Sequence, residues 1–212
     1  MPLKLPEYYS SLDLKKKAEW DNIKSIFDNS LKEFSIKGTS SPHISDFHLI
    51  NTKNKPIFYN AWKLKNNSNN FTLCLIEYET HYEEAHRYGS SIKKDTHKYF
   101  FGYLTTPIDL GQVLIRPETI ADKISELINP IEIDIKGFEK FNKRYYVLAN
   151  NQDKFMKGID ADLLNYLANI KNVQLEFNGN RCFFRLLKAI DKNETIKLCE
   201  IGFKFDEIFN NK

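Results

Sequence analysis

Three of the five histidines of this chain lie close together, in a stretch that also holds several carboxylates. The stretch is residues 79–103, ETHYEEAHRYGSSIKKDTHKYFFGY, and its histidines are His81, His86 and His97. Imidazole and carboxylate groups are ligands that zinc takes in proteins when they converge on one point. The residue types therefore raise the question of a metal site.

The spacing of these histidines argues against a site made by one element alone. His81 and His86 lie about 140° apart around a helix and on opposite faces of a strand. If residues 79–97 are the tip of a hairpin, His81 and His97 can meet across it as metal ligands, with Glu79 or Asp95 adding a third group. The alternative, which we favour, is a polar, solvated loop between two paired strands.

Other catalytic patterns have less support. The sequence has no GxSxG elbow, no Walker A motif and no GxGxxG loop, so we expect no cofactor and name no catalytic residue. Glu132 and Asp134 share one strand face in IEIDI, although alternating acids more often mark the wet face of a sheet. The three cysteines, Cys74, Cys182 and Cys199, have apolar neighbours, which predicts buried free thiols in a reducing compartment.

The charge of the chain disfavours a nucleic-acid partner. The net charge is +3, from 31 Lys and Arg against 28 Asp and Glu, whereas nucleic-acid domains are usually strongly basic. Aromatic and basic residues do interleave in HKYFFGYL, KRYYV and NRCFFR, a pattern found in sheets that stack bases. The aromatic order of an RNA-recognition sheet is missing, so we interpret these rings as core residues and keep weak single-stranded nucleic-acid binding as an alternative.

The elements that would position such groups follow from the periodicity. Apolar residues recur at helical spacing in a long first helix from Asp13, which Gly38 can end, and in later segments. These later helices are expected at residues 117–129, 153–170 and 193–209. Between residues 45 and 115 the period is two, which predicts an antiparallel meander. The Asn-Gly pair between VQLEF and RCFFRLLKAI predicts a further hairpin, and IEIDI and KRYYVLA are strand candidates.

We therefore predict an α+β fold, a mostly antiparallel sheet with helices packed on one face and a long N-terminal helix. KGTSSPH reads as a linker, so residues 1–38 form an N-terminal helical segment and residues 39–212 a single α+β domain. The first helix packs on this domain or on a partner, and we favour the domain. The first residues lack the apolar region of a signal peptide, and no run approaches the roughly 18 apolar residues of a membrane span. We expect a cytoplasmic protein without a transmembrane segment.

Residues 75–187 resemble a bacterial family known only as domain of unknown function 3137. The resemblance rests on Phe138, Glu139, Phe141 and Val147 of one phrase, on Gln152 and Asp153 at a turn in reversed order, on the helix core Leu163, Leu164 and Leu167, and on EYETHY, HKYFFGYL and GQVLIRPE upstream. These are core and turn residues, so the resemblance implies a fold and no activity. Members often carry membrane helices ahead of this domain, and that property does not carry over to this sequence.

The sequence thus favours a non-catalytic protein-binding or scaffolding module over an enzyme. Its expected partner is a protein, which includes a second copy of the chain. A hydrolase with a carboxylate or metal centre in the cleft between sheet and helices is the alternative from another class. A concave pocket lined by convergent polar groups would favour the enzyme, and a flat apolar patch would favour the binding module.

Overall fold

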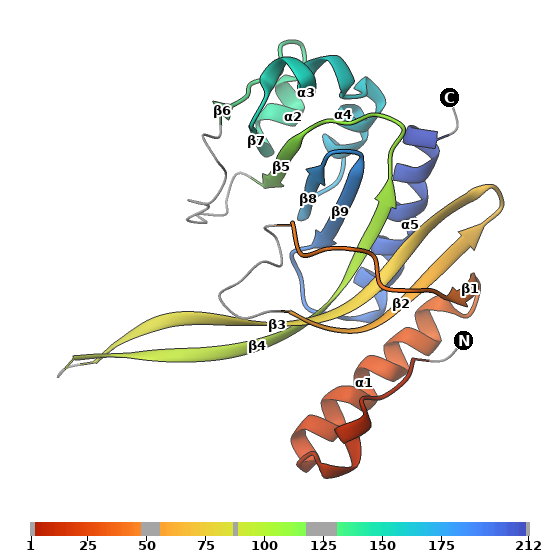
Figure 1. The fold of residues 1–212 in the computed structure, drawn as a ribbon, viewed down its shortest axis with the longest axis vertical. Coiled ribbons are helices and arrows are strands. Elements are labelled where there is room, and N and C mark those ends of the chain that lie inside the picture. Colours follow the sequence, from red (N-terminus) through yellow and green to blue (C-terminus); the bar gives the residue numbers. More distant parts are fainter. Residues whose placement is uncertain (1–2, 48–55, 87–88, 118–130, 211–212) are drawn as a thin grey trace.

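The computed structural model describes residues 3–47, 56–86, 89–117 and 131–210, with only the backbone course for residues 79–86, 89–90, 94–95 and 131–132. Across these residues nine strands form one sheet in the order β1-β2-β3-β4-β9-β8-β5-β7-β6, and the described neighbours pair antiparallel (Figure 1). The predicted α+β class with a mostly antiparallel sheet is confirmed.

The strands are β1 (Ser35–Gly38), β2 (Ile57–Asn66), β3 (Asn69–His86), β4 (Gly89–Thr105), β5 (Gln112–Pro117), β6 (Ile131–Glu132), β7 (Tyr145–Ala149), β8 (Val173–Asn178) and β9 (Arg181–Leu186). The helices are α1 (Leu14–Leu31), α2 (Glu139–Asn142), α3 (Gln152–Gly158), α4 (Ala161–Leu167) and α5 (Lys192–Asn210), and a 3-10 turn, η1 (Glu7–Ser11), precedes them. The helices share one hydrophobic core with the same face of the sheet, as predicted.

Helix α1 docks on this core. Asp13 caps its start, since its Oδ1 accepts a hydrogen bond of 2.9 Å from the Lys16 N–H. Trp20 and Phe27 are buried, and the Phe27 ring lies 4.4 Å from the ring of Trp62 on β2. The structure therefore places the first helix on the sheet, next to α5 (Figure 1).

Helix α1 is shorter than predicted. It ends at Leu31, not near Gly38, and residues 35–38 form β1, which pairs with β2. The β-branched Ile36 lies opposite Leu64, so pairing at the sheet edge outweighs the continuation of the helix. The first two residues of KGTSSPH, Lys37 and Gly38, therefore belong to β1, and only the rest of this segment is part of the connection to β2.

The helix predicted over residues 153–170 is two helices. Gly158 ends α3, where a Cβ would lie 2.5 Å from the Leu110 side chain and would displace it, so glycine allows this close approach. Asp160 then caps α4, and its Oδ1 accepts from the Asp162 N–H at 2.7 Å. Helical spacing continues across the break, which is why periodicity alone missed it.

Four other predictions have different outcomes. The β8–β9 hairpin is confirmed, with Gly179 at φ +65° in its turn. Helix α5 is confirmed, and Gly202 in its middle allows close packing, because a Cβ there would lie 2.8 Å from the Phe71 ring. IEIDI contributes only Ile131–Glu132 as β6. The helix predicted at residues 117–129 lies almost wholly outside the described residues.

Candidate functional site: the arm and the aromatic face

The β3–β4 hairpin extends well beyond the rest of the sheet (Figure 1). Strand β2 pairs with β3 only as far as Glu77, and β9 pairs with β4 only from Gly102 to Thr105. The β3–β4 ladder itself continues without a break to His86 opposite Gly89. We call residues 78–86 and 89–101 the arm, which at 3.3 Å per residue reaches roughly 30 Å from the sheet.

The arm corrects the prediction of a loop at residues 79–97. These residues continue both strands, so the charged stretch is a two-stranded ribbon and not a hairpin tip. Residues with high strand propensity, such as Tyr82, Ile92 and Thr96, recur among its charges and favour the extended form. Charge and polarity suggested a loop, while the unbroken ladder shows strands.

The ladder places the two candidate metal ligands at different positions. His97 lies opposite Tyr78, whereas His81 lies opposite Lys94, three residues further out along the arm. Positions an odd number of residues apart lie on opposite faces of a ribbon. The strand register therefore does not place His81 opposite His97, as the expected cross-strand pair would require. Within the described part of the chain no group of three or more His, Cys, Asp or Glu residues could hold a metal, and zinc binding by the two histidines stays a prediction.

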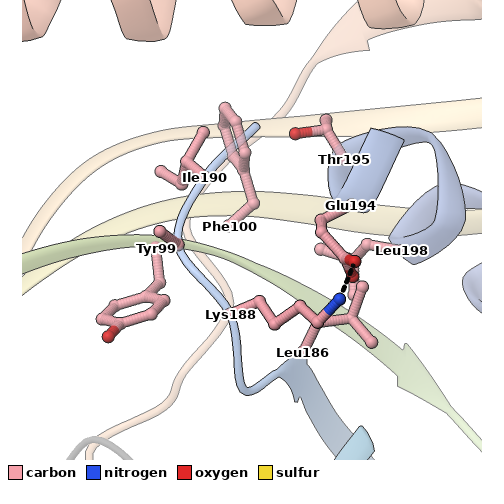
Figure 2. A pocket seen from close by; sticks show the side chains of 9 residues that line it. Tyr99, Phe100, Leu186, Lys188, Ile190, Glu194, Thr195 and Leu198 are labelled. Carbon is pink, nitrogen blue, oxygen red and sulfur yellow. Dashed lines mark hydrogen bonds and ion pairs between the residues drawn. The ribbon is translucent and has the colours of Figure 1, made fainter. Parts of the chain in front are cut away.

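Rings gather where the arm joins the sheet, on the face opposite the helices. Tyr78 stacks on Tyr99 at 5.5 Å, and His97 lies 5.9 Å from Tyr78. Phe101, the next residue of this row, stacks on Phe183 of β9 at 4.6 Å. Alternation along β4 sends the intervening Phe100 to the helix side (Figure 2).

Arg185 of β9 lies over these rings. Its guanidinium carbon is 5.7 Å from the ring centre of Tyr78, 5.5 Å from that of Tyr99 and 5.8 Å from that of Phe101. Cations within about 6 Å of a ring face are attracted by its quadrupole. We call Tyr78, His97, Tyr99, Phe101 and Arg185 the aromatic face.

Hydrogen bonds fix Arg185 in this position. Its Nε donates to Oε1 of the buried Gln174 at 2.9 Å, and Nη1 donates to the Tyr78 hydroxyl. Neither partner carries a negative charge, so neither neutralises the guanidinium. Burial raises the pKa of Tyr78, against the smaller lowering effect of the Arg185 charge, so the phenol stays protonated at neutral pH.

A small notch marks the point where β9 leaves β4 (Figure 2). Tyr99 and Phe100 line it from β4, Leu186 from the end of β9, Ile190 from the connection that follows, and Leu198 from α5. The notch holds about 20 Å³, which is room for one water molecule or a methyl group. Lys188 and Glu194 form an ion pair of 2.6 Å beside it. The notch is too small for a substrate.

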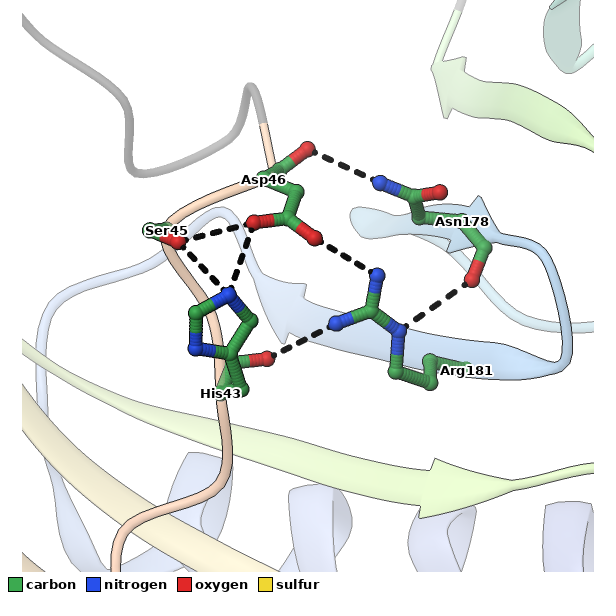
Figure 3. A network of polar contacts seen from close by, with 5 residues as sticks. All are labelled: His43, Ser45, Asp46, Asn178 and Arg181. Atoms are coloured by element: carbon green, nitrogen blue, oxygen red, sulfur yellow. Dashed lines mark hydrogen bonds and ion pairs between the residues drawn. The ribbon is translucent and has the colours of Figure 1, made fainter.

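A second polar cluster resembles a catalytic triad in composition only (Figure 3). Ser45 Oγ lies 3.0 Å from His43 Nε2, and Asp46 Oδ1 lies 3.0 Å from the same nitrogen. A triad needs the serine and the carboxylate on different ring nitrogens, so that the carboxylate orients the base. Here Ser45 also donates to Asp46 at 2.7 Å, and the three residues are close neighbours in sequence. The cluster therefore lacks triad geometry.

The same cluster ties the β1–β2 connection to the β8–β9 hairpin. Arg181 Nη2 donates to Asp46 Oδ2 at 2.8 Å, and its Nη1 donates to the His43 carbonyl at 3.2 Å (Figure 3). This arginine holds the pKa of Asp46 at about 2 through a hydrogen bond. The neighbouring Phe47 is fully buried and packs on Phe183 at 5.3 Å. The connection covers part of the sheet face opposite the helices.

The three cysteines have the predicted form. Cys74, Cys182 and Cys199 are free and buried, and burial raises the pKa of each thiol. Neutral buried thiols are poor nucleophiles.

Of the predicted carboxylate pair, Asp134 is exposed, and the side chain of Glu132 lies outside the described residues.

Sequence reasoning missed the grouping of the aromatic face. The three segments with interleaved rings and basic residues are predicted as core. Phe100 and Phe184 do lie in the helix-side core, and Phe101 and Phe183 lie in a second buried cluster on the opposite face. Tyr99 and Arg185 face that side too and are only partly buried. Strand alternation in HKYFFGYL and NRCFFR carried this signal, because every second residue must leave the core face.

Comparison with known proteins supports the fold. No protein-family model matches the sequence, and no curated protein matches it. A similar solved structure is that of the mycobacterial trehalose monomycolate transport factor A, TtfA, with a TM-score of 0.54 over 89% of this chain and 92% of that chain. The sequence identity is 8%, so the likeness shows a shared α+β fold and nothing about the site. Among the described helices, none is long and apolar enough to cross a membrane.

Proposed function

We propose that this chain is a non-catalytic protein-binding module, and that the arm with the aromatic face is its binding surface. The observation that carries this proposal is the arm, whose strands pair only with each other beyond Glu77 and Gly102 within the described residues. We further propose that the module is cytoplasmic, where its buried thiols stay reduced, and that it belongs with the domain of unknown function 3137 proteins it resembles.

A two-stranded ribbon is marginally stable in water without a third strand or a packed face. Beyond its inner end, where Tyr78, Phe100 and Phe101 pack on the sheet, the arm sequence is mostly charged and polar, so it offers few apolar residues for a core of its own. A partner that packs on the ribbon would provide the packed face or third strand that the described residues do not supply. This is the pattern expected of a recognition element.

The aromatic face suits protein recognition because rigid rings and arginine lose little conformational entropy on binding. Tyr99 and His97 are half-buried, and the guanidinium of Arg185 already stands over the rings. The rings stack on one another rather than standing apart for bases, which supports a protein partner over single-stranded nucleic acid. TtfA is described as a transport factor, and a non-catalytic role here fits that fold-level analogy.

Photocrosslinking tests this proposal. A benzoylphenylalanine in place of Ile92, which is 73% exposed on the arm, should crosslink a partner protein in the native cell. The matched control carries the same group in place of Leu14, which is 86% exposed at the start of α1. Mass spectrometry of the adducts identifies the partner.

A partner that crosslinks from Ile92 and not from Leu14 supports the arm as the binding surface. Equal adducts from both positions, or none from the arm, would overturn it. The melting temperature of both variants shows that the fold is intact, because neither side chain is buried.

A further inference from the structure

The outer edge of β4 presents backbone groups in a known order. The Thr106 N–H donates to the Asn180 carbonyl at 2.7 Å, so the backbone groups of even-numbered residues at this end of β4 point toward β9. The register with β3 is continuous from Tyr103 to Gly89, so the same alternation holds along the strand. The N–H groups of Ile92, Thr96 and Lys98 therefore point away from β3.

Strand β9 covers only the inner end of this edge. Its pairing with β4 stops at Phe184 opposite Gly102, and the chain turns away at the notch beside Phe100. Between Gly89 and Phe101 the described residues include no strand on this side of β4. An edge of this length with unpaired backbone groups is a template for an added strand.

The charges near the open edge of β4 indicate which kind of strand could pair with it. The outer part of β4 carries lysines at positions 93 and 94 against one aspartate, Asp95. Lys98, further in, already pairs with Glu19 at 2.8 Å and with Glu77 at 3.2 Å, so it adds no attraction for a new strand. Its present neighbour β3 is acidic, with glutamates at positions 77, 79, 83 and 84. On the open side, the nearest cation of the aromatic face is Arg185, whose bonds to Gln174 and Tyr78 are to neutral groups. Opposite charges on neighbouring strands are favourable.

From these observations we propose that the partner contributes an acidic, extended peptide segment that pairs with the open edge of β4 between Ile92 and Phe100. The segment continues the line of β9 past the point where β9 leaves the sheet. Its carboxylates on the aromatic side lie next to Arg185, and a small side chain at its inner end fills the notch at Tyr99. This inference rests on the proposed function and specifies its binding mode.

Hydrogen exchange on the full chain tests the pairing directly. The probe is a synthetic peptide of alternating glutamate and valine, and the matched control peptide has lysine for each glutamate. The acidic peptide should protect the N–H groups of Ile92, Thr96 and Lys98, which exchange rapidly in the protein alone. The N–H of Tyr99 points toward β3, so its exchange should change little. The lysine peptide should bind at least about tenfold more weakly.

A proline substitution tests the edge by a second route. Thr96→Pro removes an outward N–H and leaves the β3 ladder in place, because proline is tolerated where the N–H faces solvent. It should weaken binding of the acidic peptide about tenfold or more, whereas Thr96→Val keeps the N–H and should bind within about twofold of the original. An unchanged melting temperature for both variants confirms that binding, and not folding, is affected.

The outcomes separate this inference from the proposed function. If the arm crosslinks a partner but the acidic peptide protects none of the even-numbered amides, the arm binds protein by another mode and the edge pairing is overturned. If these amides are already protected in the protein alone, or become so as its concentration rises, the chain or a second copy occupies the edge and the inference is wrong. Equal binding of the acidic and lysine peptides would overturn the charge preference.

Discussion

The two faces of the sheet use the same residue types in different ways. On the helix side, rings such as Phe184 and Phe205 are fully buried and meet edge to face, 5.0 Å apart. On the opposite side, Tyr99 keeps part of its surface exposed, and rings stack under the guanidinium of Arg185. Burial by α1 and α5 produces the first arrangement, while the β1–β2 connection and Arg185 produce the second.

This difference separates stability from recognition. The helix face buries aromatic surface completely, which is the largest favourable term in folding. On the aromatic face Tyr78 and Phe101 are buried as well, while His97, Tyr99 and Arg185 keep part of their surface exposed beside an open strand edge. A fully buried ring such as Phe205 should therefore matter for folding, and a partly exposed ring such as Tyr99 should matter more for binding.

Removal of the first helix should have the largest effect. Deleting residues 1–38 removes α1 and β1 and exposes the core that Trp20 and Phe27 cover. Several buried side chains at about 1.5–3 kcal/mol each approach the whole stability of a typical domain. We expect the remaining chain to lose its cooperative thermal transition, measured by near-ultraviolet circular dichroism. A deletion that melts at the original temperature would show that residues 39–212 fold alone.

Matched ring truncations compare the two faces directly. Phe205→Ala empties a fully buried site and should cost about 3–5 kcal/mol in the free energy of unfolding. Tyr99→Ala removes a partly exposed stacked ring and should cost about 1 kcal/mol. Urea denaturation measures both, and equal costs would contradict the division between the faces.

A smaller effect is expected where α5 approaches β3. Gly202→Ala places a Cβ about 2.8 Å from the Phe71 ring, and such overpacking should destabilise the chain by about 1–3 kcal/mol. Helix propensity alone would favour alanine by about 1 kcal/mol, so the sign of the change distinguishes packing from propensity. Glu207→Ala, on the exposed side of the same helix, is the control and should change stability by less than about 0.5 kcal/mol.

Local rules in the sequence predicted much of the fold. Asp13 caps α1 and the Asn-Gly turn joins β8 to β9, because each depends on a few neighbouring residues. The end of α1 at Leu31 depends on the pairing of Ile36 with Leu64, which is distant in sequence. Tertiary contacts of this kind override local periodicity.

The candidate site was less predictable than the fold. The sequence identified the charged stretch but not its conformation, because polar alternation fits an exposed strand as well as a loop. The position of Arg185 over Tyr78 joins residues from β9 and β3, two strands that are not neighbours in the sheet. A single sequence does not specify which strands meet, so this contact required the structure.

The smallest effect is expected for the ion pair between Asp46 and Arg181, which links the β1–β2 connection to the β8–β9 hairpin. Asp46 has a pKa of about 2 in the folded chain, against an ordinary value of 3.8, chiefly because Arg181 donates to it. A lowered carboxyl pKa stabilises the folded state fully above the ordinary value, and this contribution is lost as the pH falls through about 2. Since the pair is partly exposed, the contribution should be below about 1 kcal/mol.

An acid titration followed by NMR should therefore show the Asp46 carboxyl protonating near pH 2. Over the same range the N–H of Phe47, which donates to the Ile44 carbonyl at 3.1 Å, should exchange faster as the connection loosens. Asp46→Asn should bring that faster exchange to neutral pH, while Asp28→Asn, at an exposed pair within α1, should leave it unchanged. If Phe47 exchanges at the same rate in Asp46→Asn as in the original chain, apolar packing on Phe183 holds the connection without the ion pair. The two faces would then be held by the same kind of interaction and would differ only in how much ring surface each one buries.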